Sequence, residues 1–155
     1  MSNPDKFLLM TPRFSEWNSK SPLDWKSYQN AIGRFDSFLC SINILQPFFI
    51  EYQGMILNTF NIDDLQKSVD KLRKVYSDPQ IEYLINHIHI GDLFLNDPDS
   101  DTIPIEVYDY IADSIVTMWR LQLTKLFPHK HFVIDIKNRG IDPEVYVIQA
   151  PFVGE

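Results

Sequence analysis

The sequence predicts an α+β fold in which three to four helices pack on a small, largely antiparallel sheet. Three observations lead to this class: helical periodicity early in the chain, a long helix in its second half, and two pairs of apolar runs separated by turn residues, the second of which follows that helix. The 155 residues contain no Pro/Gly/Ser-rich linker, and 45% of them are hydrophobic. We therefore expect a single domain over residues 21–155, preceded by an extended segment over residues 1–20.

The first expected helix has the clearest amphipathic pattern. Ser21 and Pro22 are typical of a helix start, and apolar residues then recur at alternating steps of three and four over about five turns. The apolar residues are Trp25, Tyr28, Ile32, Phe35, Leu39 and Ile42. We expect this stripe to pack against the fold, which outweighs the cost of about 1 kcal/mol for Gly33 inside the helix. Cys40 lies beside the stripe and is expected to behave as a small hydrophobe.

The middle of the chain predicts a hairpin and two further helices. Two apolar runs on either side of Gln53-Gly54 favour a β-hairpin after Pro47 ends the first helix, and Asn61 is expected to cap the next one. Residues 80–95 allow two interpretations, because their apolar residues first fit helical spacing and then alternate as in a strand. We favour a short helix, starting after Ser77, followed by an extended piece.

The last third of the chain predicts a loop, a long helix and a second hairpin. Residues 97–101 alternate aspartate with other loop-forming residues, and Pro104 opens a helix that reaches about Phe127. Two strands, over residues 131–136 and 144–150, then flank a polar turn.

Negative charge is concentrated between Gly91 and Trp119. This segment has no lysine or arginine and contains seven acidic residues: Asp92, Asp97, Asp99, Asp101, Glu106, Asp109 and Asp113. The whole chain has 21 acidic and 14 basic residues and a net charge of −7, so the remainder has 14 of each and the segment accounts for the net charge. An ordinary solvated surface has this pattern, and so does a surface that attracts a basic partner.

The four histidines form two pairs that are close together in the sequence. His87 and His89 are two residues apart, a spacing that places both imidazoles on one face of a strand and suits zinc or iron, with Asp92 as a third ligand. A half-exposed strand that shows two polar residues to solvent is the simpler interpretation. His129 and His131 follow the long helix, where capping or solvation is expected.

Several functional classes are excluded by missing residues. The alternating aspartates of residues 97–101 resemble the start of a calcium loop, but Thr102 and Tyr108 occupy the positions that require glycine and glutamate. There is no glycine-rich phosphate loop, nucleophile elbow or His-Glu-x-x-His motif, so we expect no cofactor and no catalytic activity. The basic residues form no continuous track for nucleic acid.

The cysteine content and the N-terminal region bear on location. A single cysteine, Cys40, excludes an internal disulfide and fits a reducing compartment. The apolar run over residues 7–10 is too short for a signal-peptide core or a membrane span. We therefore expect a cytoplasmic protein without membrane contact.

Three functions remain. The first is a binding protein without catalytic activity that docks a basic protein through its acidic segment, as an immunity protein or antitoxin docks a toxin. Its expected contact residues are Asp97, Asp99, Asp101, Glu106, Asp109, Asp113, Tyr108 and Tyr110. The second is a metal-dependent or hydrolytic enzyme that uses His87, His89 and Asp92. The third is a self-associating module with exposed aromatic residues such as Trp17, Trp25 and Phe152.

Overall fold

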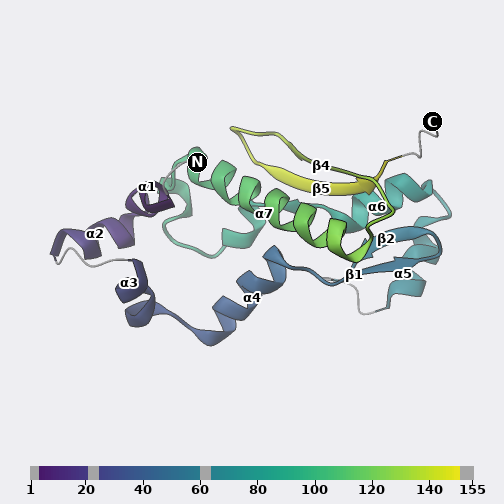
Figure 1. The fold of residues 1–155 in the computed structure, drawn as a ribbon. Helices are drawn as coiled ribbons and strands as arrows, with labels where there is room; N and C mark the ends of the chain where they lie inside the picture. Colours follow the sequence, from purple (N-terminus) through teal and green to yellow (C-terminus); the bar gives the residue numbers. More distant parts are fainter. Residues whose placement is uncertain (1–3, 21–24, 60–63, 151–155) are drawn as a thin grey trace.

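The computed structural model, which describes residues 4–20, 25–59 and 64–150, has the expected α+β class (Figure 1). In chain order its elements are α1 (Pro4–Leu9), α2 (Pro12–Lys20), α3 (Trp25–Ile32), α4 (Phe35–Leu45), β1 (Phe49–Tyr52), β2 (Met55–Asn58), α5 (Leu65–Leu72), α6 (Asp78–Asn86), β3 (Ile88–His89), the 3₁₀ turns η1 (Gly91–Phe94) and η2 (Ser100–Thr102), α7 (Ile105–Leu126), β4 (Phe132–Lys137) and β5 (Glu144–Gln149). Strands β1 and β2 form one antiparallel sheet, and a second antiparallel sheet has the order β3-β5-β4.

The main core lies between α7 and the three-stranded sheet, which run side by side in Figure 1. Ile115, Trp119 and Leu123 recur along one side of α7 and are buried against Val145 and Val147 of β5. Burying each of these side chains contributes about 1.5–3 kcal/mol relative to exposure. The expected long helix is therefore confirmed, and it lies at the centre of the fold.

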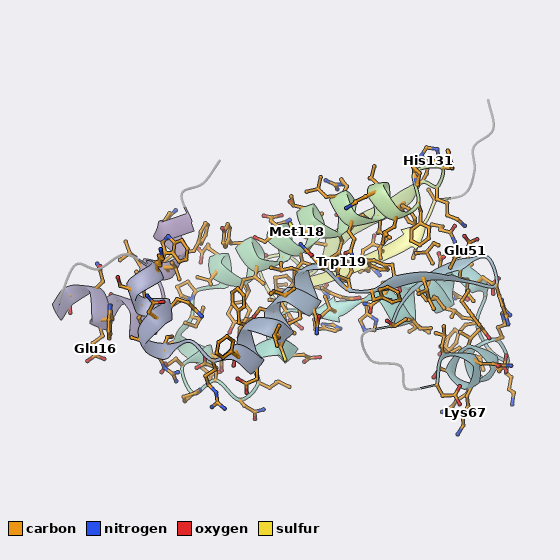
Figure 2. The ribbon with its side chains drawn as sticks, turned by 60° about the horizontal axis from the view of Figure 1, so that its bottom comes forward. Glu16, Glu51, Lys67, Met118, Trp119 and His131 are labelled. Atoms are coloured by element: carbon orange, nitrogen blue, oxygen red, sulfur yellow. The ribbon has the colours of Figure 1, made fainter. Side chains whose placement is uncertain are left out.

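Trp119 also fixes the end of α4. Its indole Nε1 donates a hydrogen bond to the carbonyl oxygen of Ile44 at 2.9 Å, and Gln122 Nε2 donates to the carbonyl oxygen of Pro47. Figure 2 labels Trp119 near the C-terminal end of α4. These bonds join the chain between α4 and β1 to the core helix.

Both expected hairpins are confirmed. In the first, Glu51 pairs with Ile56, and the turn residues Gln53 and Gly54 have positive φ angles of 50° and 87°. Two consecutive left-handed residues are the requirement of a two-residue hairpin turn, which glycine meets at little cost. In the second hairpin β4 pairs with β5 from Phe132 to Lys137.

The ambiguous stretch is a helix followed by a short strand, as favoured. Ser77 caps α6 through a reciprocal bond with Gln80, and Pro79 occupies the first turn. After His87 the chain extends into β3, which pairs with β5. Residues 80–95 thus contain both of the elements that their pattern indicated.

The expected extended N-terminal segment is wrong, because residues 4–20 form α1 and α2. Phe7 of α1 stacks on Tyr110 of α7 with ring centroids 4.2 Å apart. Phe14 of α2 is buried, and its ring is edge-to-face with that of Tyr28 in α3. The prolines that suggested an extended chain stand instead in the first turns of the two helices, where the missing amide hydrogen is tolerated.

The expected five-turn helix is also wrong in two respects. It is divided into α3 and α4 at Gly33 and Arg34, and neither helix has a buried residue. Cys40, expected beside a packed stripe, is exposed. The residues expected to start this helix, 21–24, and Asn61, expected to cap the next one, lie outside the described residues. Within the described chain α5 begins at Leu65, with the Asp64 side chain accepting a hydrogen bond from the Lys67 amide.

No helix in the described part of the chain is both long enough and apolar enough to cross a bilayer.

Candidate functional site

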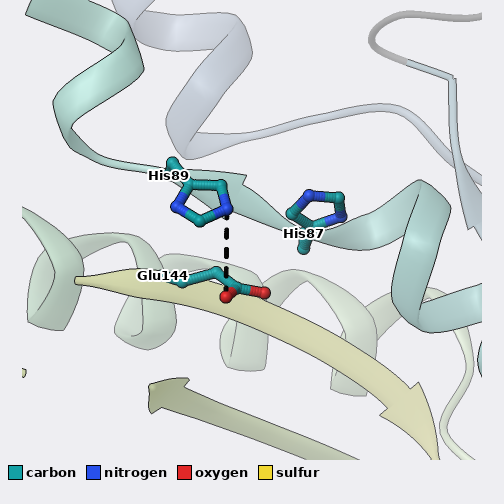
Figure 3. A group of neighbouring side chains, drawn as sticks. All are labelled: His87, His89 and Glu144. Carbon is teal, nitrogen blue, oxygen red and sulfur yellow. Dashed lines mark ion pairs between the residues drawn. The ribbon is translucent and has the colours of Figure 1, made fainter. Parts of the chain in front are cut away.

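Three regions outside the core are candidates for a functional site: a histidine-carboxylate cluster, the acidic segment, and the apolar side of α4. The first is formed by His87, His89 and Glu144, whose nearest ligand atoms all lie within 4.8 Å of one another (Figure 3). Strand pairing brings them together, because His89 of β3 lies opposite Glu144 of β5. The two expected histidines therefore do share a site, and a buried carboxylate from the far hairpin completes it.

Each imidazole in the cluster is oriented by an oxygen acceptor at Nδ1. His87 Nδ1 lies 3.0 Å from the carbonyl oxygen of Leu84 and 3.2 Å from that of Tyr83. His89 Nδ1 lies 3.2 Å from the Asp142 carboxylate. Since these oxygens are acceptors, the Nδ1 atoms carry hydrogens, and in the neutral imidazoles the Nε2 lone pairs are left to accept a ligand.

The Glu144 carboxylate has further partners on its other side. The Tyr83 hydroxyl donates a hydrogen bond to Oε1, and the Lys137 ammonium lies 3.8 Å from the centroid of the Tyr83 ring. Burial, and then the hydrogen bond to Glu144, raise the pKa of Tyr83 above its ordinary value. The interaction with Tyr83 raises the pKa of Lys137 as well. The buried carboxyl group of Glu144 is thus surrounded by a phenol, an ammonium and two imidazoles.

Asp92 is not part of this cluster, so the expected third ligand is wrong. The chain turns into η1 after Ile90, and Asp92 is exposed there. β3 ends at His89, and in a strand that continued to Asp92 this side chain would lie on the face opposite to His87 and His89. His129 and His131 are exposed after α7, at the end of the molecule where Figure 2 labels His131.

Two arginines from other parts of the chain form ion pairs with acids of the acidic segment. Arg13 of α2 lies 2.7 Å from Asp99 and 3.6 Å from Asp97, and Arg139 of the β4–β5 turn lies 2.7 Å from Asp113. The Asp113 carboxylate is the main cause that raises the pKa of Arg139. Three of the seven acids are therefore partly neutralised, which reduces the negative potential of the segment.

The remaining expected contact residues differ in exposure. Asp101 and Glu106 are exposed, whereas Asp109 accepts a hydrogen bond from the amide of Gly140. Tyr108 donates to the carbonyl oxygen of Ser100, and Tyr110 stacks on Phe7. Both tyrosines are half-buried. Tyr108 therefore holds the aspartate-rich loop and Tyr110 holds α1, which leaves only part of each ring accessible to a partner.

The apolar side of α4 is the feature that the sequence pattern identified but assigned to the core. Its side chains lie at i, i+3, i+4 and i+7 and are exposed: Phe35 by 91%, Phe38 by 55%, Leu39 by 58% and Ile42 by 38%. We call these four residues the α4 face. Trp25 and Ile32 of α3 are exposed by more than half as well.

A groove of about 250 Å³ lies where α2 and α3 meet the acidic loop and α7. Ile32, Ile103 and Ile111 line its apolar wall, while Asp97 and Asp99 lie on its polar side. Tyr28, whose pKa is raised chiefly by burial, also lines it. The groove thus has both an apolar wall and carboxylates. Ile32 in its lining precedes Phe35, the first residue of the α4 face, by three residues.

Among the residues expected to mediate self-association, only Trp25 is described as exposed. Trp17 is half-buried against the Tyr28 ring, with centroids 5.7 Å apart, and Phe152 lies outside the described residues.

Comparison with protein-family models, with curated proteins and with solved structures finds no match to this chain.

Proposed function

We propose that this chain is a protein-binding domain that docks a partner segment carrying both apolar and basic side chains. One observation carries the proposal: the α4 face is apolar and exposed, with Phe35 almost entirely in solvent. Apolar residues at helical spacing pack against something in most proteins, and contiguous exposed patches of them mark interaction sites. Within the described residues nothing covers this face.

The energy available from the α4 face supports binding over a purely structural role. Burying a large apolar side chain contributes about 1.5–3 kcal/mol, so the four residues together can support a stable complex after the cost of association is subtracted. Phenylalanine and leucine at i, i+3, i+4 and i+7 also match the spacing by which helices pack in grooves or against one another. The α4 face therefore supplies the affinity in this proposal.

Charge selects a basic partner over a second copy of this chain. The chain has a net charge of −7, so two copies repel one another, whereas a basic segment is attracted. Asp97 and Asp99 line the groove beside Tyr28 and Ile32, where a lysine or arginine of the partner can compete with Arg13 for them. Asp101 and Glu106 stay free to steer its approach.

An immunity or antitoxin protein is one kind of cytoplasmic protein that works in this way, by occluding a basic toxin. In this proposal the acidic segment determines which partner approaches, and the α4 face determines how tightly it is held. The function needs no catalytic group.

The test uses two labelled helical peptides with the same leucine pattern, one with lysines and the other with glutamates at the polar positions. Fluorescence anisotropy should show that the lysine peptide binds, and that the glutamate peptide binds at least tenfold more weakly. The variant Phe35→Ser/Leu39→Ser should lose binding of the lysine peptide without losing stability, because both side chains are exposed.

Leu121→Ser is the matched control, since Leu121 is 63% exposed on α7, outside the α4 face. Equal affinity for both peptides, or equal losses in the control, would contradict the proposal. Light scattering separates the self-associating alternative: a dimer that Phe35→Ser/Leu39→Ser converts to monomer would assign the α4 face to a second copy.

A further inference from the structure

The cluster of His87, His89 and Glu144 contains an electrostatic conflict. With His89 neutral and its Nδ1 hydrogen directed to Asp142, the Nε2 lone pair faces the Glu144 Oε2 atom at 3.9 Å. Two acceptors cannot bond to each other, and 3.9 Å is longer than a hydrogen bond. A cation between them removes the conflict.

His87 indicates which kind of cation fits. A proton on His89 would satisfy Glu144 alone, but the His87 ring lies edge-to-face with the His89 ring, with centroids 5.5 Å apart, and its Nδ1 is likewise turned to backbone carbonyls. Two imidazoles with Nε2 left free and one buried carboxylate form a set of three ligand groups. Metal-ligating histidines characteristically donate their other ring N–H to a carbonyl or carboxylate, as both do here.

We propose that His87, His89 and Glu144 bind one divalent transition-metal ion, with zinc as the best fit. Imidazole nitrogen and carboxylate oxygen are the ligands that zinc prefers, and a set of two histidines and one glutamate leaves a fourth position for water. Calcium and magnesium prefer sites made of oxygen atoms only, which this cluster is not. This site is independent of the α4 face and of the proposed protein-binding function.

Binding requires the three side chains to draw closer together. Tetrahedral zinc with bonds of about 2.0–2.1 Å places its ligand atoms roughly 3.3 Å apart, whereas the cluster spans up to 4.8 Å. β3 is a two-residue strand at the edge of its sheet, and both imidazoles are only half-buried. The histidines can therefore move towards the more rigidly held Glu144, whose other oxygen is bonded to Tyr83.

Two neighbours should change the metal affinity in opposite directions. Asp142 orients His89 and increases its basicity, so it is a positioning residue, and Asp142→Asn should weaken zinc binding by about 10-fold or more.

Lys137 lies opposite Glu144 on β4, and its positive charge repels the metal ion. Lys137→Gln should therefore strengthen zinc binding severalfold, which no purely structural role of the lysine explains.

The experiment titrates zinc into the full chain carrying Cys40→Ser, which removes the exposed thiol as a competing ligand. Isothermal titration should give one site, and cobalt in its place should give the intense visible absorption of a tetrahedral centre. His89→Ala and Glu144→Gln should each weaken zinc binding at least tenfold, with the circular dichroism spectrum unchanged. Gln keeps an acceptor for the Tyr83 hydroxyl, so the fold tolerates it.

Asp92→Asn and His129→Ala are the matched controls, since both residues are exposed and lie outside the cluster. Their zinc affinity should equal that of the parent. Failure of the folded parent to bind zinc at micromolar concentration, or equal losses in the controls, would overturn the proposal. A loss in His89→Ala with full binding by Glu144→Gln would also overturn it, because the carboxylate is essential to the site.

Discussion

Two buried polar side chains of α6 connect the two sheets where no backbone ladder joins them. Asn86, 1% exposed, donates to the carbonyl oxygens of Ile56 and Val147 and accepts from the Asn58 amide. Glu82 accepts from the amides of Ile56 and Gln149. Because Glu82 and Asn86 are four residues apart, both project from one side of the helix into the seam between β2 and β5.

Removing Asn86 should destabilise the fold through the groups that it leaves unpaired. Asn86→Ala leaves one buried amide and two buried carbonyls without a partner, each of which costs about 1–3 kcal/mol, so we expect a loss of at least about 3 kcal/mol. Urea denaturation measures the free energy of unfolding. Gln66→Ala, at an exposed position of α5, is the control and should change it by less than about 0.5 kcal/mol. A comparable change in both variants would contradict the role of Asn86.

The Tyr83–Glu144 hydrogen bond predicts a loss of stability in alkali. Burial, and then Glu144, hold the pKa of Tyr83 above its ordinary value of 10.0. A group whose pKa is raised on folding contributes stability below its unfolded pKa and loses it as the pH rises through the folded pKa. The free energy of unfolding should therefore fall above pH 10.0, and Tyr83→Phe should make this fall shallower. Denaturation at a series of alkaline pH values measures the slope, with Tyr76→Phe as the exposed control.

At the scale of elements, local patterns identified most helices and hairpins but could not say what each one packs against. α7 was predictable because a long apolar stripe follows Pro104, and the first hairpin because Gln53-Gly54 suits its turn. The stripe over residues 25–42 has an equally clear period, yet α3 and α4 have no buried residue. Periodicity reports that a face is apolar, and tertiary structure or a partner decides whether it is covered.

The cluster of His87, His89 and Glu144 was half predictable for the same reason. The spacing of His87 and His89 is local, and the backbone is extended at His87 and continues into β3, so the sequence was enough to expect both imidazoles near one another. Glu144 joins them only through the pairing of β3 with β5, which links distant parts of the chain. Nothing in the neighbourhood of Glu144 distinguishes it from other acids before that pairing is known. Asp92 was nearer in sequence, but η1 directs the chain away.

The break between α3 and α4 depends on Gly33 and should respond to substitution. The Gly33 amide closes α3 by donating to the Gln29 carbonyl oxygen at 2.7 Å, and a Cβ at Gly33 would lie only 2.4 Å from that oxygen. Gly33→Ala cannot keep this geometry, whereas a continuous helix accommodates alanine and gains about 1 kcal/mol in propensity. We expect higher helicity by circular dichroism, with Ala31→Gly as the reverse control. Unchanged helicity would show that other contacts maintain the break.

At the scale of the whole molecule, affinity and charge occupy different surfaces. The four residues of the α4 face are uncharged, and the acids that account for the net charge of −7 lie in η1, on the loop after it and along α7. Apolar contacts act over a few ångströms, whereas the field of a charge extends about 10 Å at 0.1 M salt before screening removes most of it. The two surfaces should therefore control different rates, the acids governing association and the α4 face governing dissociation.

This separation predicts that charge variants change the association rate and that an apolar variant changes the dissociation rate. Both rates are measured with the lysine peptide by stopped-flow fluorescence. Neutralising Asp97, Asp99, Asp101 and Asp109 to asparagine should slow association severalfold and flatten its dependence on salt. Arg139→Gln, which frees Asp113, should accelerate association with little effect on stability, since the pair is exposed. Phe35→Ser should leave the association rate nearly unchanged and raise the dissociation rate. If the neutralised variant associates as fast as the parent at every salt concentration, the acidic segment is only a solvated surface and the partner need not be basic.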